Sequence, residues 1–176
     1  GEDAYIIAKM NSLLDKKVIA KLYEASANGV RIDLIVRGIC TLRPGIAGVS
    51  DNITVRSIVG RFLEHHRLFY FRSGGNEKIF LSSADWMPRN LNERVELMIP
   101  IEDKRHKARI KGILDLYLVD TLKAHLMRSD GSYYKVSNIE GPLSAQEELM
   151  EAANTQDSRE QMTVIERFKP MFKMKE

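Results

Sequence analysis

The densest group of residues able to do chemistry is the run Glu64-His65-His66-Arg67, which is followed by the apolar segment 68–71, a glycine turn and the segment 79–86. An imidazole can act as an acid, a base or a nucleophile, and a guanidinium neutralises phosphate charge. Small residues such as Ser82 and Ser83 let backbone N–H groups approach an anion closely, and their hydroxyls add donors. The combination favours phosphoryl chemistry. The alternative interpretation is a pair of surface histidines at the entry to a strand.

The spacing of the run distinguishes its two histidines. Residues i and i+2 of a strand point to the same side. His65 therefore shares a side with Arg67, whereas His66 shares a side with Leu68 and is expected to face apolar neighbours. We predict that His65 does the chemistry and that Arg67 contacts phosphate beside it.

Arg37 is a second candidate, because it directly follows the apolar segment 32–36. In α/β sheets, ligands bind outside the carboxyl ends of parallel strands. Gly38 would allow a close approach there. Eight of the nine basic residues between positions 37 and 94 are arginines, whose planar fork binds phosphate oxygens in pairs. This enrichment favours a phosphorylated partner, and a solvated basic face is the alternative.

Four other residues are weaker candidates. Cys40 has no obvious base partner and is expected to be a buried structural thiol. His106 and His125 lack partners at ligand spacing and are expected on the surface, and Trp86 is expected in the core or an interface rather than against an adenine. The sequence has no P-loop, no Gly-x-Gly-x-x-Gly and no His/Cys metal spacing, so we predict no metal ligand.

Length and composition limit the class of protein. The chain has 176 residues, 44% of them hydrophobic and 29% charged, which is typical of one globular domain. Its longest apolar run, residues 4–8, is far short of the roughly 20 residues of a membrane span and gives no secretory signal. A single cysteine excludes a disulfide framework and fits a cytoplasmic protein. The chain begins with Gly1 rather than Met, and we expect a piece of a longer protein.

The apolar periodicity predicts an α/β fold with a mixed sheet. A strand at 5–9, a helix at 15–27 and a strand at 32–36 form a βαβ unit with parallel strands. Further expected elements are a helix or bend at 55–64, a hairpin of 68–71 with 79–82, a strand at 95–99, a helix at 103–127 and a helix at 144–154. We expect a domain over 1–137 and a helical or flexible tail over 138–176.

Four long motifs resemble the C-terminal domain of bacterial polyphosphate kinase. They are KMNSL at 9–13, LYEASANGVRIDLIVRGICTLRPG at 22–45, SIVGRFLEHHR at 57–67 and LSSADWMPRN at 81–90, and the resemblance runs from about residue 5 to 130. That family carries two tandem domains similar to phospholipase D, and this chain resembles the second. The resemblance implies a phospholipase D-like mixed sheet flanked by helices, one half of a tandem pair.

The resemblance also implies a reaction and a set of roles. The family reversibly transfers the terminal phosphate of ATP to inorganic polyphosphate through a phosphohistidine, with magnesium. His65 would bind nucleotide and act as acid/base, Arg37 would contact ATP, and Arg67, Ser82, Ser83 and Arg89 would be further phosphate contacts. The phosphohistidine and most of the magnesium site would lie in the preceding domain, so the isolated chain would be inactive.

The implied partners are ATP or ADP, polyphosphate, the preceding domains and further copies of the full-length enzyme, with no nucleic acid. The implied location is the cytoplasm, and the alternative is a peripheral position at the inner membrane.

The sequence departs from the phospholipase D half-motif, which reads His-x-Lys and then Gly-Ser-x-Asn. Arg67 replaces the Lys, Ser82-Ser83 the Gly-Ser and Asp85 the Asn. Two alternatives stay open. Half of a phospholipase D-type phosphodiesterase would need a second His-x-Lys motif. A non-catalytic polyanion-binding module would need exposed aromatics, whereas Phe69 and Phe71 are expected to be buried.

Overall fold

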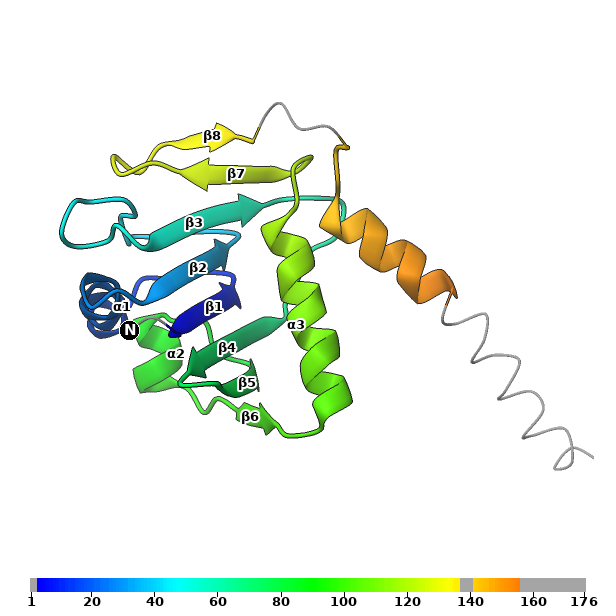
Figure 1. Ribbon diagram of the computed structural model, residues 1–176, viewed down its shortest axis with the longest axis horizontal. Helices are drawn as coiled ribbons and strands as arrows, with labels where there is room; N and C mark the ends of the chain where they lie inside the picture. Colours follow the sequence, from blue (N-terminus) through cyan, green and yellow to red (C-terminus); the bar gives the residue numbers. More distant parts are fainter. Residues whose placement is uncertain (1–2, 137–140, 156–176) are drawn as a thin grey trace, which may run out of the picture.

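The computed structural model describes residues 3–136 and 141–155, which form a mixed eight-stranded sheet with the order β6-β5-β4-β1-β2-β3-β7-β8 (Figure 1). The strands β1, β2 and β3 are parallel, and the other neighbours are antiparallel. The predicted α/β class is therefore confirmed. The elements are β1 (Tyr5–Met10), α1 (Lys16–Ala27), β2 (Arg31–Val36), β3 (Ile53–Ile58), β4 (Arg67–Ser73), β5 (Asn76–Ser82), α2 (Pro88–Glu93), β6 (Met98–Ile101), α3 (Lys104–Leu118), β7 (Ala124–Met127) and β8 (Tyr133–Lys135).

The predicted βαβ unit is present as β1, α1 and β2. Asp15 caps α1, and its carboxylate accepts hydrogen bonds from the backbone N–H groups of Lys17 at 3.0 Å and Val18 at 2.9 Å. Asn28 ends the helix, and Gly29 turns the chain back with φ +83°. The two caps thus fix the start and the end of α1. The chain then enters β2, which pairs in parallel with β1.

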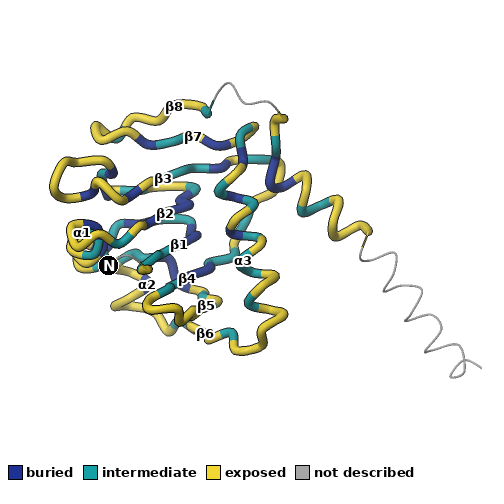
Figure 2. The backbone as a smooth tube through the Cα atoms, viewed as in Figure 1, coloured by how far each residue is buried: buried dark blue, intermediate teal, exposed yellow. Residues whose placement is uncertain are grey.

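The central strands are buried on both faces, so the domain has three layers (Figure 2). On one face, Met10 and Leu34 belong to the core cluster that includes Leu22 of α1. On the other face, Ile7 belongs to the cluster that includes Tyr117 of α3. Strand side chains alternate between the faces, which explains why neighbouring apolar residues of β1 and β2 enter different clusters.

Two predicted helices are corrected by the structure. Residues 53–58 form β3 rather than a helix or bend, because Ile53 and Val55 are buried while Thr54 is exposed, and because β3 pairs with β2 and β7. The helix expected over 103–127 ends at Leu118. Asp120 then accepts hydrogen bonds from the backbone of Lys123 and Ala124, which starts β7.

The edges of the sheet hold the remaining differences. The strand expected at 95–99 is β6, Met98–Ile101, and it includes Pro100 instead of stopping before it. Because β6 is an edge strand, the missing N–H of the proline costs no bond within the sheet. The short helix α2 and the hairpin of β7 with β8 were not predicted.

Residues 145–155 form the helix expected at 144–154, and it extends away from the sheet (Figure 1). Its first turn is buried, since Ser144, Ala145 and Gln146 are only 4%, 0% and 6% exposed. Residues beyond the domain boundary predicted between 137 and 138 are therefore buried against the domain. The rest of the predicted tail, residues 156–176, lies outside the described residues. None of the helices in the described part of the chain is long and apolar enough to span a membrane.

Candidate functional site at the carboxyl ends of the parallel strands

The sheet brings the predicted site residues to one edge. β1 and β2 end at Met10 and Val36, which are paired, and β4 starts beside the end of β1 because Leu68 pairs with Lys9. Arg37 and the run that carries His65 therefore meet at the carboxyl ends of the parallel strands, where α/β proteins bind ligands. Only β1 lies between β2, which Arg37 follows, and β4, which His65 precedes. Neighbouring strands are about 5 Å apart, so the two residues belong to the same small region.

Gly38 allows two chain segments to meet at this edge. Its N–H donates a hydrogen bond of 2.8 Å to the carbonyl of Asn11. A Cβ atom at residue 38 would lie only 3.0 Å from that same carbonyl oxygen. The glycine therefore brings the end of β2 close to the end of β1.

Arg67 and Asp85 form an ion pair that fixes the backbone of His65. The Arg67 Nη2 lies 3.0 Å from Asp85 Oδ2, and its Nε donates to Oδ1 at 3.2 Å. Asp85 Oδ1 also accepts from the backbone N–H of Asn11 at 2.7 Å and of Ser12 at 3.3 Å. The remaining Nη1 of Arg67 donates to the carbonyl of His65 at 2.5 Å. The pair thereby ties His65 to the end of β1, and the contact of Arg67 with phosphate stays a prediction.

The side chains of His65 and Arg37 are free to meet a ligand. His65 is exposed and Arg37 is half-buried. Within residues 3–136 and 141–155, neither imidazole nor guanidinium has a hydrogen bond or ion pair to another side chain. An exposed imidazole and an uncompensated guanidinium at one edge can neutralise an anion and move a proton beside it.

A buried ion pair lies directly before His65. Lys9 Nζ is 2.6 Å from Glu64 Oε2, and the two side chains are only 4% and 9% exposed. The hydroxyl of Tyr117 donates to Glu64 Oε1 at 2.5 Å, and Lys9 Nζ lies 4.7 Å from the centre of the Tyr117 ring. Burial raises the pKa of Glu64, but Lys9 and the hydrogen-bond donors outweigh it and hold the pKa below its usual value.

Burial also lowers the pKa of Lys9, and Arg37 and Arg67 act in the same direction. At the carboxyl ends of the strands, two of the cations are paired with Glu64 and Asp85, and Arg37 adds a further positive charge. Such a region stabilises a bound anion.

His66 points into the protein, as predicted. Its ring centre lies 5.7 Å from that of Tyr117, and its Nε2 is buried with no hydrogen-bond partner among the described residues. Burial, followed by the charge of Lys9, lowers the pKa of His66 to about 4. His66 is therefore neutral at physiological pH, and its Nε2 is not accessible to a ligand.

The low pKa of His66 predicts a loss of stability in acid. Between pH 6.5 and about 4 the unfolded chain binds a proton that the folded chain rejects, so stability falls as the pH decreases through this range. We expect a contribution of about 2 kcal/mol, after allowance for solvent around the half-buried ring. Urea unfolding of the 176-residue chain at pH 7 and pH 4.5 measures it. The variant His66→Phe should lose less stability between these pH values than the natural sequence, and equal losses would contradict this account.

The other predicted phosphate contacts are placed less directly. The hydroxyl of Ser82 accepts from the N–H of Ala84 at 3.0 Å. The hydroxyl of Ser83 donates to Glu96 and accepts from the N–H of Leu97 at 2.9 Å. Both hydroxyls therefore form hydrogen bonds within the protein at the end of β5. Arg89 is exposed on α2. The phosphate contacts of these three residues stay predictions.

The weaker candidates have structural surroundings. Trp86 stacks on Phe69 with ring centres 4.8 Å apart. Burial raises the pKa of the Cys40 thiol to about 11, so it is not an activated nucleophile. His106 and His125 are exposed. Among residues 3–136 and 141–155, no three His, Cys, Asp or Glu side chains are grouped so that they could hold a metal ion.

The buried residues that support the loop before His65 were not predicted from the sequence. Lys9, Glu64, Tyr117 and Gln146 come from four separate segments, and the contacts among them join residues as far apart as Lys9 and Tyr117. One signal was available. Lys9 is the only charged residue within the apolar segment 4–10, and a lysine in a buried strand needs an acidic partner.

Comparison with known proteins gives one consistent family. The model of the family described as "Polyphosphate kinase C-terminal domain 2" matches residues 1–146. The polyphosphate kinase of Pseudomonas aeruginosa is 56% identical over 153 residues, which are 86% of this chain and 22% of that protein. The chain thus spans about a fifth of the length of this curated relative.

Solved structures agree with the fold. The crystal structure of polyphosphate kinase from Porphyromonas gingivalis has a TM-score of 0.83 and 42% identity, covering 89% of this chain and 24% of that one. NucT from Helicobacter pylori has a TM-score of 0.51 with 12% identity, covering 65% of this chain and 78% of that one, and shows a likeness in fold alone. The phospholipase D-like sheet expected from the sequence is therefore confirmed.

Proposed function

Because this chain belongs to the polyphosphate kinase family, we propose that it supplies one half of an active site that moves the terminal phosphate of ATP reversibly to inorganic polyphosphate. The observation that carries the proposal is the common position of His65 and Arg37. Both side chains are unpaired within the described residues, and both lie at the carboxyl ends of the parallel strands. The family match covers both residues.

In the proposed reaction, each side chain has a distinct role. Arg37 binds phosphate oxygens of the nucleotide and neutralises the charge that builds up as the terminal phosphate leaves. His65 binds the nucleotide and accepts or returns a proton during transfer. Arg67 stays paired with Asp85 and holds His65 in place.

The preceding domain completes the proposed site. It would hold the histidine that becomes phosphorylated, so the terminal phosphate leaves ATP for that histidine, ADP departs, and the phosphate then joins the end of the polymer. Magnesium, which the resemblance implies, would bind mainly to the preceding domain. The isolated chain would be inactive, and the full-length enzyme would work in the cytoplasm.

Replacing Arg37 tests the binding role. In the full-length enzyme, Arg37→Ala is expected to lower kcat/KM for ATP about 10- to 100-fold, since a hydrogen bond to a charged group contributes roughly 1.5–3 kcal/mol. Arg37→Lys should recover only part of this loss, because lysine cannot bind two oxygens with a fixed fork. The measurement is the initial rate of polyphosphate synthesis over a range of ATP concentrations.

Arg31 provides the matched control. It begins β2, the strand that Arg37 follows, and so lies at the opposite end of the sheet, where its exposed side chain pairs with Asp33. Arg31→Ala should leave kcat/KM for ATP within about twofold, because its guanidinium lies at the opposite end of β2 from Arg37. Equal effects of the two alanine variants would contradict a specific role for Arg37.

A further inference from the structure

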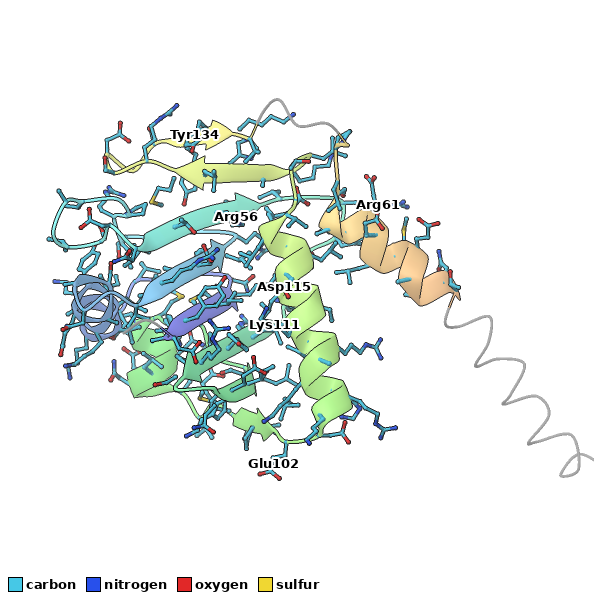
Figure 3. The ribbon with its side chains drawn as sticks, viewed as in Figure 1. Arg56, Arg61, Glu102, Lys111, Asp115 and Tyr134 are labelled. Carbon is cyan, nitrogen blue, oxygen red and sulfur yellow. The ribbon has the colours of Figure 1, made fainter. Side chains whose placement is uncertain are left out.

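The loop that carries His65 is held by one side chain from the far end of the chain. Residues 59–66 join β3 to β4. Gln146 Oε1 accepts from the backbone N–H of Phe62 at 2.9 Å, and its Nε2 donates to the carbonyl of the same residue at 3.0 Å. Figure 3 shows Arg61, the neighbour of Phe62, beside the start of the helix of residues 145–155. The amide of Gln146 thus fixes the backbone of Phe62 at both its N–H and its carbonyl group.

Gly60 lies directly against this amide. A Cβ atom at residue 60 would be 2.3 Å from Gln146 Oε1 and 2.7 Å from its Cδ. The backbone of Gly60 has no positive φ, so close packing and not backbone conformation calls for glycine here. The side chain of Gln146 therefore lies against the loop at both Gly60 and Phe62.

A third hydrogen bond connects Gln146 to the residue before His65. Its Nε2 donates to Glu64 Oε1 at 2.9 Å, and the same carboxylate is bound by Lys9 and Tyr117. On the other side of His65, Arg67 donates to the His65 carbonyl. The backbone around His65 is thus fixed from both directions, while its imidazole stays free.

Gln146 is itself firmly placed. Asp120, which is 1% exposed, accepts from the N–H of Ala145 at 2.8 Å and from that of Ala124 at 3.0 Å. Thr121 accepts from the N–H of Leu143 at 2.9 Å. The turn between α3 and β7 therefore holds the residues on both sides of position 144, and the family match also extends as far as residue 146.

From these contacts we infer that Gln146 is a positioning residue for His65, an inference that rests on the proposed function. Its three hydrogen bonds orient the loop so that the imidazole of His65 meets the reacting phosphate. Gln146 does not touch substrate. Its loss should therefore slow the chemical step while ATP still binds through Arg37.

The test separates the hydrogen bonds of Gln146 from its volume. In the full-length enzyme, Gln146→Met keeps most of the side-chain volume and removes all three hydrogen bonds. We expect kcat to fall about 10- to 100-fold, because displacements of about 1 Å at a catalytic group cost that much. The KM for ATP should stay within about threefold, since uniform binding is untouched. Glu147→Met, at the exposed neighbouring position, should change neither constant.

Gly60→Ala supplies a second, independent variant. The added methyl group should displace the amide and lower kcat when Gln146 is present. With Gln146→Ala in the same chain the methyl group has room, so Gly60→Ala should then cost little more. Additive effects of the two changes on kcat would contradict the contact on which the inference depends.

Failure of the inference is distinct from failure of the proposed function. If His65→Ala retains turnover, the acid/base role of His65 is wrong. If His65→Ala abolishes turnover but Gln146→Met has a normal kcat, the function stands and the inference is wrong. A fall in kcat together with an equal rise in KM and a lower melting temperature would indicate general unfolding, and it would also overturn the inference. In the His65→Ala background, Gln146→Met should change the residual rate little.

Discussion

Replacing His65 by alanine in the full-length enzyme should lower the rate of polyphosphate synthesis about 10²- to 10⁴-fold, the usual contribution of general acid/base catalysis. The reason is the position of the imidazole. It is exposed at the carboxyl ends of the parallel strands, and the backbone on both sides of it is fixed by Arg67 and Glu64. The measurement is kcat with saturating ATP, for a variant whose melting temperature matches that of the natural enzyme.

His66 is the matched control for this experiment, since it is the adjacent histidine with the opposite orientation. His66→Phe keeps an aromatic ring against Tyr117 and removes the unpaired Nε2. Its turnover should stay within about threefold of the natural enzyme, because no proton transfer is lost. Equal losses for the two variants would mean that the histidine pair serves packing, and the assignment of His65 would be wrong.

Removing Lys9 should have the largest effect on stability. Lys9→Met leaves the carboxylate of Glu64 buried without its cation, and breaking a buried pair in this way typically costs about 3–5 kcal/mol. The Nζ–Oε2 distance is 2.6 Å, and both side chains are almost fully buried. Urea unfolding of the 176-residue chain at pH 7 measures the change.

The exposed pair of Lys21 and Glu24 gives a control at the same distance of 2.6 Å, with side chains 78% and 61% exposed. Lys21→Met should change the free energy of unfolding by less than about 1 kcal/mol. Combining Lys9→Met with Glu64→Gln should recover part of the loss, because no charge is then left unpaired in the core. A loss for Lys9→Met no greater than that for Lys21→Met would contradict the account of the buried pair.

The sequence predicted the elements whose signals are local. The helix α1 was predicted correctly because its caps, Asp15 and Asn28, lie next to its apolar stripe. The hairpin of β4 with β5 was correct because Gly74 and Gly75 mark its turn, both with positive φ. The position of Arg37 directly after the apolar segment 32–36 then predicted the edge of the sheet at which we propose the site.

Elements that depend on distant partners were predicted poorly. Residues 53–58 are a strand because β2 and β7 lie on both sides, a condition that no local pattern shows. The helix α3 ends at Leu118, although apolar residues continue at helical spacing, because Asp120 binds the backbone that follows. The contact of Gln146 with Glu64 joins residues 82 positions apart, so one sequence alone does not reveal it.

Two of the three departures from the phospholipase D half-motif are physically connected. Arg67 stands in place of the lysine and Asp85 in place of the asparagine, and these two side chains form an ion pair with each other. The contact of Arg67 with phosphate, expected from the sequence, stays a prediction. The structure shows that the exchanged residues complement each other and together hold His65 at the end of β1.

The most direct test of the proposed function is to follow the labelled phosphate itself. The full-length enzyme is mixed with ATP labelled at the terminal phosphate, stopped with base within one turnover, and digested to locate the protein-bound label. The account predicts label on a histidine outside residues 1–176, formed more slowly in the His65→Ala and Arg37→Ala variants. Label on the peptide that contains His65 would contradict it, because His65 would then be the nucleophile instead of the acid/base.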